Sequence, residues 1–188
     1  MIKFNNIIGH ITRILYYRFI MADIGYGTLI IKPLKIGNPK LISVGSRTYI
    51  GSQSWLMGVN SNGHISLKIG DRVQIGHFAH IVAMENVDIE NDVLLADKVF
   101  ISDCTHNYEN ISKPVSVQGV RLLKHVIIGE GTWLGENVCV CGASIGKHCI
   151  IGANSVVTQD IPDYSVAVGS PAKVIKKYDF KKCEWIKC

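Results

Sequence analysis

An aliphatic residue returns about every six positions through most of this 188-residue chain. The period is clearest between Val126 and Val157, where glycine usually follows the repeated residue, as in Ile128-Gly129 and Ile151-Gly152. A period of six fits neither the 3.6 residues of a helical turn nor the alternation of a long strand. It fits short strands that are separated by tight turns and wound into a parallel β-helix. The repeat therefore predicts an all-β solenoid.

The repeated residues fall into six groups of three, which predicts about six coils with three sides each. The groups are Ile24, Ile30, Ile36; Val44, Ile50, Leu56; Ile69, Ile75, Ile81; Ile89, Leu95, Ile101; Ile128, Leu134, Val140; and Ile145, Ile151, Val157. The steps between groups are 8, 13, 8, 27 and 5 residues, so insertions are expected at the corners of a prism. Side chains alternate along a strand, so residues just before the repeated ones, such as His80 and Trp133, should face outward.

The two ends of the chain lack this repeat. Residues 2–19 place apolar side chains at helical spacing, and their polar residues make the segment unsuited to crossing a bilayer. We assign residues 1–22 to an amphipathic helix, residues 23–160 to the β-helix with a loop at 102–125, and residues 161–188 to a C-terminal extension. The helix is expected to cap the first coil, with a membrane-surface role as the alternative.

Charge and cysteine content limit the possible binding partners and the cellular compartment. The formal net charge is +5, and six lysines occupy the last sixteen residues: Lys173, Lys176, Lys177, Lys181, Lys182 and Lys187. Such an end suits nucleic acid, an anionic membrane or a phosphorylated cofactor, or is simply solvated. The six cysteines include no CxxC pair, and Cys139 and Cys141 are interpreted as small packing residues. With no signal peptide apparent, we expect a cytoplasmic protein with reduced thiols.

The 27-residue step after Ile101 is too long for a corner and is the most promising place for function. It contains His106 among polar residues. A histidine near its ordinary pKa suits proton abstraction from a hydroxyl at neutral pH. Asp103, three residues earlier, is expected to orient the other ring nitrogen. From composition alone, an ordinary solvated loop histidine remains the alternative.

Three segments give the chain a specific resemblance: VLLADKVFISDCTHNYENISKPV, VIIGEGTWLGENV and IIGANSVVTQDIPDYSVAVGSPAKVI. They resemble the hexapeptide-repeat acyltransferases, left-handed β-helix enzymes that act as homotrimers and use acetyl-CoA. The motif is most similar to the branch that O-acetylates sugars of O-antigens, capsules and other bacterial surface glycans, and more distantly to galactoside and maltose O-acetyltransferases; it consists of the segment from Asp103 to His106, followed by Tyr108-Glu109 and Lys113-Pro114. The resemblance implies a saccharide acceptor and an all-β, left-handed parallel β-helix with a protruding catalytic loop.

The resemblance also implies roles on the acceptor side. His106 would be the general base that deprotonates a sugar hydroxyl, which then attacks the thioester without a covalent acyl-enzyme. A backbone amide near Gly135 and Glu136 would stabilise the oxyanion. His80 matches a position that contacts the acceptor in sugar acetyltransferases, and Tyr108 lies in the matched loop.

The implied donor site comes from later coils. Trp133 would line the cleft between subunits, and Ala153 falls where a backbone group binds the pantetheine arm. Further positions match contacts to that arm, the nucleotide or the phosphates of CoA: Thr158, Gln159, Lys173 and Lys176. Cationic side chains suit the several negative charges of CoA.

Two positions depart from the family pattern. Cys104 stands where many members of the glycan branch have a first histidine, so an acceptor contact from that ring is absent. The step from Val140 to Ile145 is five residues, which predicts a tightened corner.

Other classes are weaker alternatives. The γ-type carbonic anhydrases bind zinc on the same prism, and His77, His80 and His106 could be proposed as ligands. Their second loop histidine, however, is Ile111 here, so no metal is expected. A scaffold without catalysis and an acetyltransferase of a small molecule or antibiotic stay open. No nucleic acid partner is expected, and peripheral contact with an anionic membrane is a hypothesis.

Overall fold

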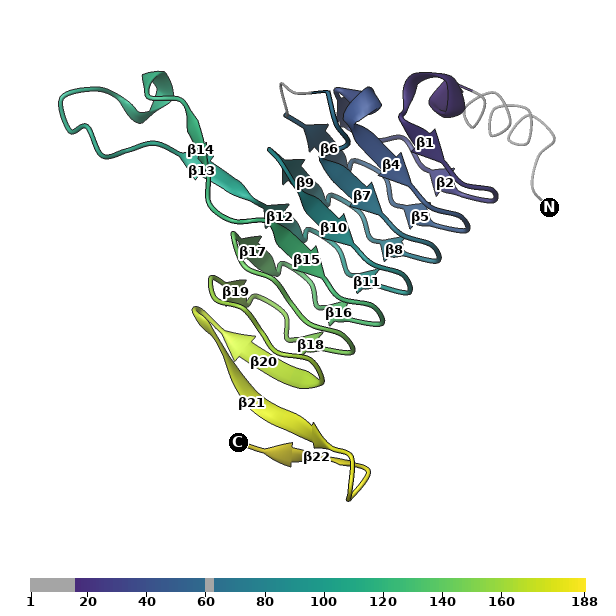
Figure 1. Ribbon diagram of the computed structural model, residues 1–188, viewed down its shortest axis with the longest axis vertical. Helices are drawn as coiled ribbons and strands as arrows, with labels where there is room; N and C mark the ends of the chain where they lie inside the picture. The colour runs from purple at the N-terminus through teal and green to yellow at the C-terminus, as the bar shows by residue number, and fades with distance from the viewer. Residues whose placement is uncertain (1–15, 60–62) are drawn as a thin grey trace.

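The computed structural model describes residues 16–59 and 63–188, which form a three-sided parallel β-helix (Figure 1). The first sheet contains β1 (Asp23–Ile24), β4 (Ile42–Val44), β7 (Leu67–Ile69), β10 (Val87–Ile89) and β15 (Val126–Ile128). The second contains β2 (Leu29–Ile30), β5 (Tyr49–Ile50), β8 (Gln74–Ile75), β11 (Leu94–Leu95), β16 (Trp133–Leu134), β18 (Ile150–Ile151), β20 (Ser165–Gly169), β21 (Ala172–Asp179) and β22 (Glu184–Lys187). The third contains β3 (Lys35–Gly37), β6 (Trp55–Gly58), β9 (His80–Ala83), β12 (Phe100–Ser102), β17 (Cys139–Cys141) and β19 (Val156–Val157).

The predicted repeat sets the register of all three sheets. In the first sheet Ile24 pairs with Val44, and the stack continues through Ile69, Ile89, Ile128 and Ile145. The second and third sheets stack the second and third members of each group in the same way. Every repeated position is buried except Ile36, which is partly buried against the core. The predicted coils and their inward faces are therefore confirmed.

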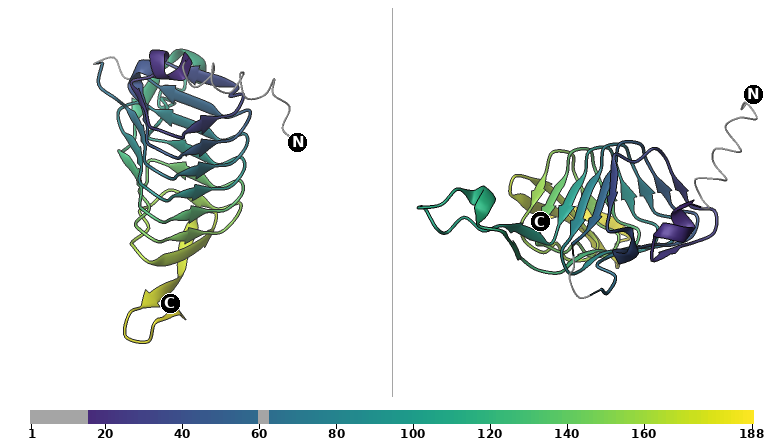
Figure 2. Two further views of the ribbon diagram at one scale, coloured as in Figure 1. Left: turned by 90° about the vertical axis from the view of Figure 1, so that its right-hand side faces the viewer. Right: turned by 90° about the horizontal axis from the view of Figure 1, so that it is seen from above.

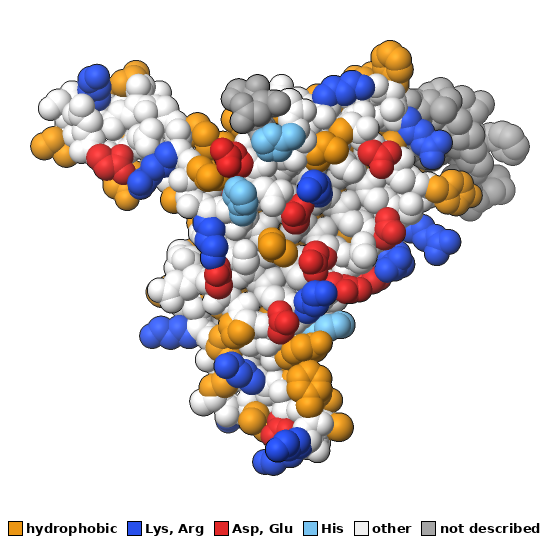
Figure 3. Space-filling model, viewed as in Figure 1, with side chains coloured by type: hydrophobic (Ala, Val, Ile, Leu, Met, Phe, Trp, Pro, Cys, Tyr) orange, Lys and Arg blue, Asp and Glu red, His pale blue; other side chains and the backbone are white. Residues whose placement is uncertain are grey.

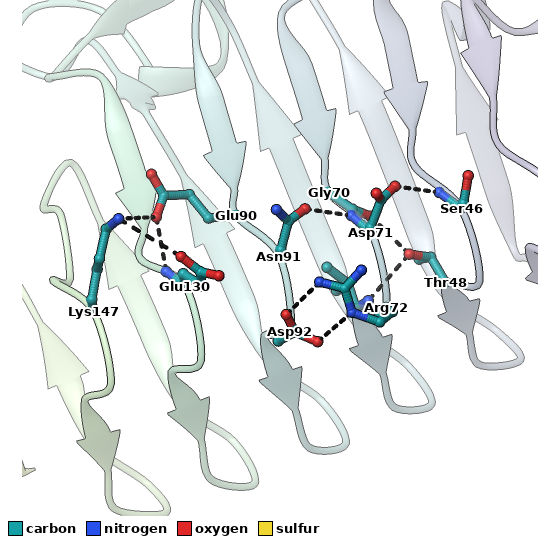
Figure 4. Close-up of polar contacts among 11 residues, drawn as sticks. Ser46, Thr48, Gly70, Asp71, Arg72, Glu90, Asn91, Asp92, Glu130 and Lys147 are labelled. Atoms are coloured by element: carbon teal, nitrogen blue, oxygen red, sulfur yellow. Dashed lines mark hydrogen bonds and ion pairs between the residues drawn. The ribbon is translucent and has the colours of Figure 1, made fainter.

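Polar side chains tie successive coils together at one corner (Figure 4). Asp71 accepts a hydrogen bond from the amide of Ser46 at 2.6 Å, and Asn91 accepts one from the amide of Asp71 at 2.8 Å. Beside this bond, Arg72 lies 2.6 Å from Asp92 in an ion pair between the same two coils. The bonds from the amides of Ser46 and Asp71 satisfy backbone groups in the turns that have no partner in a strand. Backbone groups in a tight turn at the edge of the core need such partners.

The ends of the prism are closed differently. Residues 16–20 are helical, and Tyr17 and Met21 pack into the core. The rest of the predicted N-terminal helix lies outside the described residues. At the other end two stacks continue past residue 160, because Ile161 pairs with Ile145 and Ala167 with Ile151. In residues 16–59 and 63–188 we find no helix with the length and apolar character to span a membrane.

Two antiparallel hairpins leave the prism (Figures 1 and 2). One joins β13 (Cys104–His106) to β14 (Val120–Leu122), and its tip carries the 3₁₀ turn η2 (Val115–Val117). It is the loop that the 27-residue step predicts, and it projects from the third sheet (Figure 1). The other is formed by β21 and β22 at the C-terminal end. A second 3₁₀ turn, η1 (Pro39–Leu41), precedes β4.

Candidate active site

The β13–β14 hairpin is held in shape by its own side chains. Gln118 donates from Nε2 to the carbonyls of Asn110 and Lys113, both at 2.9 Å, and accepts from the amide of Asn110 at 3.1 Å. Asn107 donates to the carbonyl of Gln118 at 3.0 Å. One glutamine thus closes the tip of the loop, so His106 lies on a structured hairpin.

Asp103 anchors this hairpin to the preceding coil, which corrects the role expected for it. Its carboxylate is fully buried and accepts three backbone hydrogen bonds, from Met84 at 2.6 Å, Glu85 at 2.7 Å and Asn86 at 2.9 Å. No hydrogen bond joins it to His106 within the described residues. Both carboxylate oxygens are used by the 84–86 turn, so Asp103 positions the hairpin and does not orient the histidine ring.

A cavity of about 290 Å³ lies where the hairpin meets the third sheet. His106 and Val120 line it from the hairpin, and His80 and Phe100 line it from the sheet. The remaining lining residues are Val82, Ser102, Cys104, Thr105, Leu123 and Cys141. An exposed imidazole therefore faces a mostly apolar cavity large enough for a small ligand group.

His80 forms part of a stack of rings on the outer face of the third sheet. Its ring lies 4.5 Å from that of Trp55 in a nearly parallel stack and 5.3 Å from that of Phe100 edge to face. Burial by these neighbours lowers the pKa of His80, since the charged form loses hydration. Its Nε2 is buried with no hydrogen-bond partner among the described residues. The outward direction predicted for His80 is correct, and burial favours the neutral form of its ring.

Three thiols lie at or beside the cavity. Cys104 and Cys141 line it, and the sulfur of Cys139 lies 3.5 Å from that of Cys141. Cys139 and Cys141 flank the buried Val140 and are half-buried on the outer face. A hydrogen bond from the Cys141 thiol lowers the pKa of Cys139 to about 7, and the same contact raises the pKa of Cys141.

The residues expected at the donor site gather at another corner. Trp133 is 46% exposed on the outer face of the second sheet, as predicted. Gly135 packs so closely on the next coil that a Cβ there would lie 2.7 Å from the amide nitrogen of Ala153. The Gly135 amide donates to the carbonyl of Ile151 at 2.8 Å, so it is not available as an oxyanion donor in this chain. Glu136 is exposed and pairs with Lys98 at 2.8 Å.

The other expected donor residues lie on the C-terminal part of the chain. Thr158 and Gln159 are exposed just after β19. Lys173 pairs with Val168, and a register shift in β20–β21 brings Lys176 opposite Val166. Val166 and Val168 share the outer face of β20, and paired residues share a face, so both lysines point the same way. No spacing in the sequence predicts this irregularity.

The cavity thus includes some of the predicted site residues and excludes others. His106 and His80 line one cavity, whereas Trp133, Gly135 and Ala153 do not line it. Tyr108 is 59% exposed on the hairpin, with the Arg121 guanidinium 5.5 Å from its ring centre. Sequence reasoning missed Val82, Phe100, Ser102 and Cys141, although alternation along the third sheet places all four outward. Leu123 had no periodic signal, and it contacts the sheet only because Gly142 leaves room beside it.

The sequence of this chain is similar to those of several known proteins. Residues 125–159 match the family described as "Hexapeptide repeat of succinyl-transferase". This segment carries the hexapeptide repeat of that family. Over 124 residues it is 44% identical to the Escherichia coli K12 protein named as a lipopolysaccharide biosynthesis O-acetyl transferase, WbbJ. That match covers 62% of this chain and 63% of the relative, so the chain spans less than two thirds of it.

Solved structures agree on the fold. The Bacillus cereus N-acyltransferase AntD, in complex with dTDP and 3-hydroxybutyryl-CoA, has a TM-score of 0.71 at 19% identity and covers 90% of each chain. A Clostridium difficile maltose O-acetyltransferase has a TM-score of 0.54 at 25% identity, covering 89% of this chain and 75% of its own. The resemblance to hexapeptide-repeat acyltransferases and the left-handed β-helix are therefore confirmed.

Proposed function

We propose that this protein is an acetyl-CoA-dependent O-acetyltransferase that modifies a sugar hydroxyl of a bacterial surface polysaccharide or its precursor. The observation that carries the proposal is the cavity in which the exposed His106 faces the half-buried His80. The similarity to WbbJ, whose name contains lipopolysaccharide biosynthesis, supports a glycan acceptor. The neighbour solved with an acyl-CoA supports the donor class.

The chemistry requires one base at the acceptor. His106 takes the proton from a sugar hydroxyl as its oxygen attacks the carbonyl carbon of the thioester. The tetrahedral intermediate then collapses, the carbon–sulfur bond breaks, and CoA leaves as a thiolate that receives the proton from the imidazolium. The acetyl ester and free CoA are the products, and the imidazole is neutral again. A free backbone amide close to Glu136 is the proposed oxyanion donor, since the amide of Gly135 is used.

His80 suits a role in acceptor binding. A neutral imidazole both donates and accepts hydrogen bonds, as a sugar hydroxyl does. The apolar lining from Val82, Phe100 and Leu123 would pack against the nonpolar face of the sugar ring. Cys104 and Tyr108 lie on the same hairpin, and Tyr108 is close enough to the loop tip to contact a longer acceptor.

The complete site is proposed to form between subunits of a homotrimer. The donor residues Trp133 and Ala153 lie apart from the His106 cavity within one chain. An outward row in the second sheet is mostly apolar and exposed: it contains Leu29, Tyr49, Leu94 and Trp133, with Gln74 between Tyr49 and Leu94. Flat apolar faces of this kind are typical subunit contacts. Association would bring the donor corner of one chain beside the hairpin of another.

The test is acceptor-dependent release of thiol from acetyl-CoA by the purified protein, with free sugars, nucleotide sugars, glycan fragments and aminoglycosides as acceptors. We expect release with a glycan or sugar acceptor and loss of release in His106→Ala. Release only with aminoglycosides would replace the glycan acceptor by an antibiotic. No release with any acceptor, together with no CoA binding by calorimetry, would favour a scaffold.

A further inference from the structure

The hairpin of β21 and β22 carries most of the net charge of the chain. Residues 172–188 contain six lysines and two acidic side chains, a net charge of +4, whereas the whole chain has +5. The remaining residues are therefore close to neutral. A short segment that concentrates the excess charge needs an explanation different from general solubility.

Among the described residues, the lysines of this hairpin have no acidic partner. Elsewhere, lysines pair between coils, as Lys98 does with Glu136 at 2.8 Å and Lys147 with Glu130 at 3.7 Å. In the part of the chain that the structure describes, none of the six hairpin ammonium groups forms an ion pair. One oxygen of Asp179 accepts the amides of Lys181 and Lys182, at 2.8 and 3.1 Å, and so closes the turn.

Aromatic side chains share the same hairpin. Tyr178 pairs with Trp185, and their rings meet edge to face at 5.4 Å. Phe180 is 64% exposed at the turn, and its ring meets that of Tyr164 at 4.8 Å. With His148 these rings line an apolar cavity of about 240 Å³. Lys187 lies two residues after Trp185 and pairs with Lys176, which lies two residues before Tyr178. Alternate residues of a strand share a face, so Lys187 lies on the same face as Tyr178 and Trp185.

The hairpin projects beyond the last coil of the prism (Figures 1 and 2). Figure 3 shows hydrophobic and basic side chains gathered at this end of the molecule. We define the tip patch as Tyr178, Phe180, Lys181, Lys182, Trp185 and Lys187. The hairpin protrudes, so a planar surface can reach the patch.

We propose that the tip patch binds the surface of an anionic membrane. Tryptophan and tyrosine favour the boundary between headgroups and acyl chains, and lysines beside them attract anionic lipids. Phe180 at the turn would enter the apolar layer while Lys181 and Lys182 contact headgroup phosphates. Single-stranded nucleic acid also binds basic and aromatic surfaces, but it requires a groove that follows its backbone. This inference does not depend on the proposed acetyl transfer.

The experiment is co-sedimentation of the full chain with vesicles of phosphatidylcholine, alone or with one quarter phosphatidylglycerol. We expect binding only to the anionic vesicles, weakened as salt rises to about 0.15 M, where charges are screened beyond roughly 8 Å. The double variant Lys181→Glu/Lys182→Glu should bind at least about ten-fold more weakly. Phe180→Ser should also reduce binding and tests the apolar part without a charge change.

The matched control is Lys32→Glu/Lys40→Glu, which makes the same charge change at the other end of the prism. It should bind like the wild type. Equal binding of the wild type and the Lys181/Lys182 variant, or loss of binding only in the Lys32/Lys40 variant, would overturn the proposal. So would binding to a single-stranded oligonucleotide without binding to anionic vesicles. Thiol release in solution should be the same in the Lys181/Lys182 variant, which separates this result from the transferase proposal.

Discussion

The prism and the β13–β14 hairpin are built by different rules. Each position in the prism has an equivalent in the coils before and after it, as Ile101 has in Ile81 and Val140. The hairpin has no such equivalents, and single contacts such as those of Asp103 and Gln118 hold it. The regular part therefore supplies a rigid wall, whereas the irregular part brings the one exposed imidazole of the cavity to that wall.

The largest expected effect falls on the hairpin. His106→Ala should lower acceptor-dependent thiol release by about 10² to 10⁴, the usual span for a missing general base. Its free energy of unfolding should hardly change, because the side chain is exposed. His125→Ala is the matched control, an exposed histidine at the end of the same insertion that does not line the cavity. Equal losses in both variants would contradict the assignment.

The next effect falls on the prism. Ile128→Ala removes a fully buried side chain and should cost about 2 to 5 kcal/mol of unfolding free energy in urea denaturation. Ile127→Ala changes the same residue type at the neighbouring outward position, which is 41% exposed. It should change stability by about 0.5 kcal/mol or less. Similar losses in the two variants would show that the inward register is wrong.

The joint between the two regions gives a smaller effect. Asp103→Asn keeps the shape but removes an acceptor from the 84–86 turn, so we expect about 1 to 3 kcal/mol of destabilisation. Activity measured on the folded fraction should also fall, because the hairpin is displaced. Asp97→Asn, where the carboxylate accepts the amide of His77 at 2.7 Å, should cost stability while leaving that activity intact. Full activity of the folded Asp103→Asn variant would show that the anchoring of the hairpin by Asp103 is not needed for activity.

The sequence predicted the wall much better than the hairpin. Residues such as Ile89 and Leu134 repeat at a spacing that only stacked coils satisfy, so their register was readable. The partners of Asp103 were not readable, since three residues of separation from His106 suggested a contact that the turn at 84–86 prevents. Lys176 shows the same limit, because a register shift depends on backbone geometry that no spacing reveals.

His80, on the wall of the prism, makes the stability of the protein depend on pH. Burial lowers its pKa, so below its ordinary value of about 6.5 the unfolded chain takes up a proton that the folded chain does not. Its contribution to stability is therefore present above about pH 6.5 and is lost as pH falls below it. Trp55→Ala should raise the pKa of His80 toward its ordinary value, as measured by NMR titration of the ring. An unchanged titration would show that the stack does not control the histidine.

The smallest effect concerns the reactivity of a thiol beside the cavity. Cys139 has a pKa of about 7 because the Cys141 thiol donates a hydrogen bond to its thiolate. Alkylation of Cys139 by iodoacetamide, followed by peptide mass spectrometry, should reach half its maximal rate near pH 7. Cys141→Ala removes the donor and should raise that midpoint. An identical midpoint in wild type and variant would show that the thiols do not interact.

The most direct test of His106 as the base is chemical rescue. Imidazole added to His106→Ala can enter the cavity and take the hydroxyl proton in place of the missing side chain. We expect imidazole to restore part of the acceptor-dependent thiol release, in proportion to its neutral fraction as pH is varied, with little effect on the wild type. A variant that keeps wild-type activity without imidazole would contradict the role of His106, and so would a variant that binds acetyl-CoA and acceptor but gains no activity at any imidazole concentration.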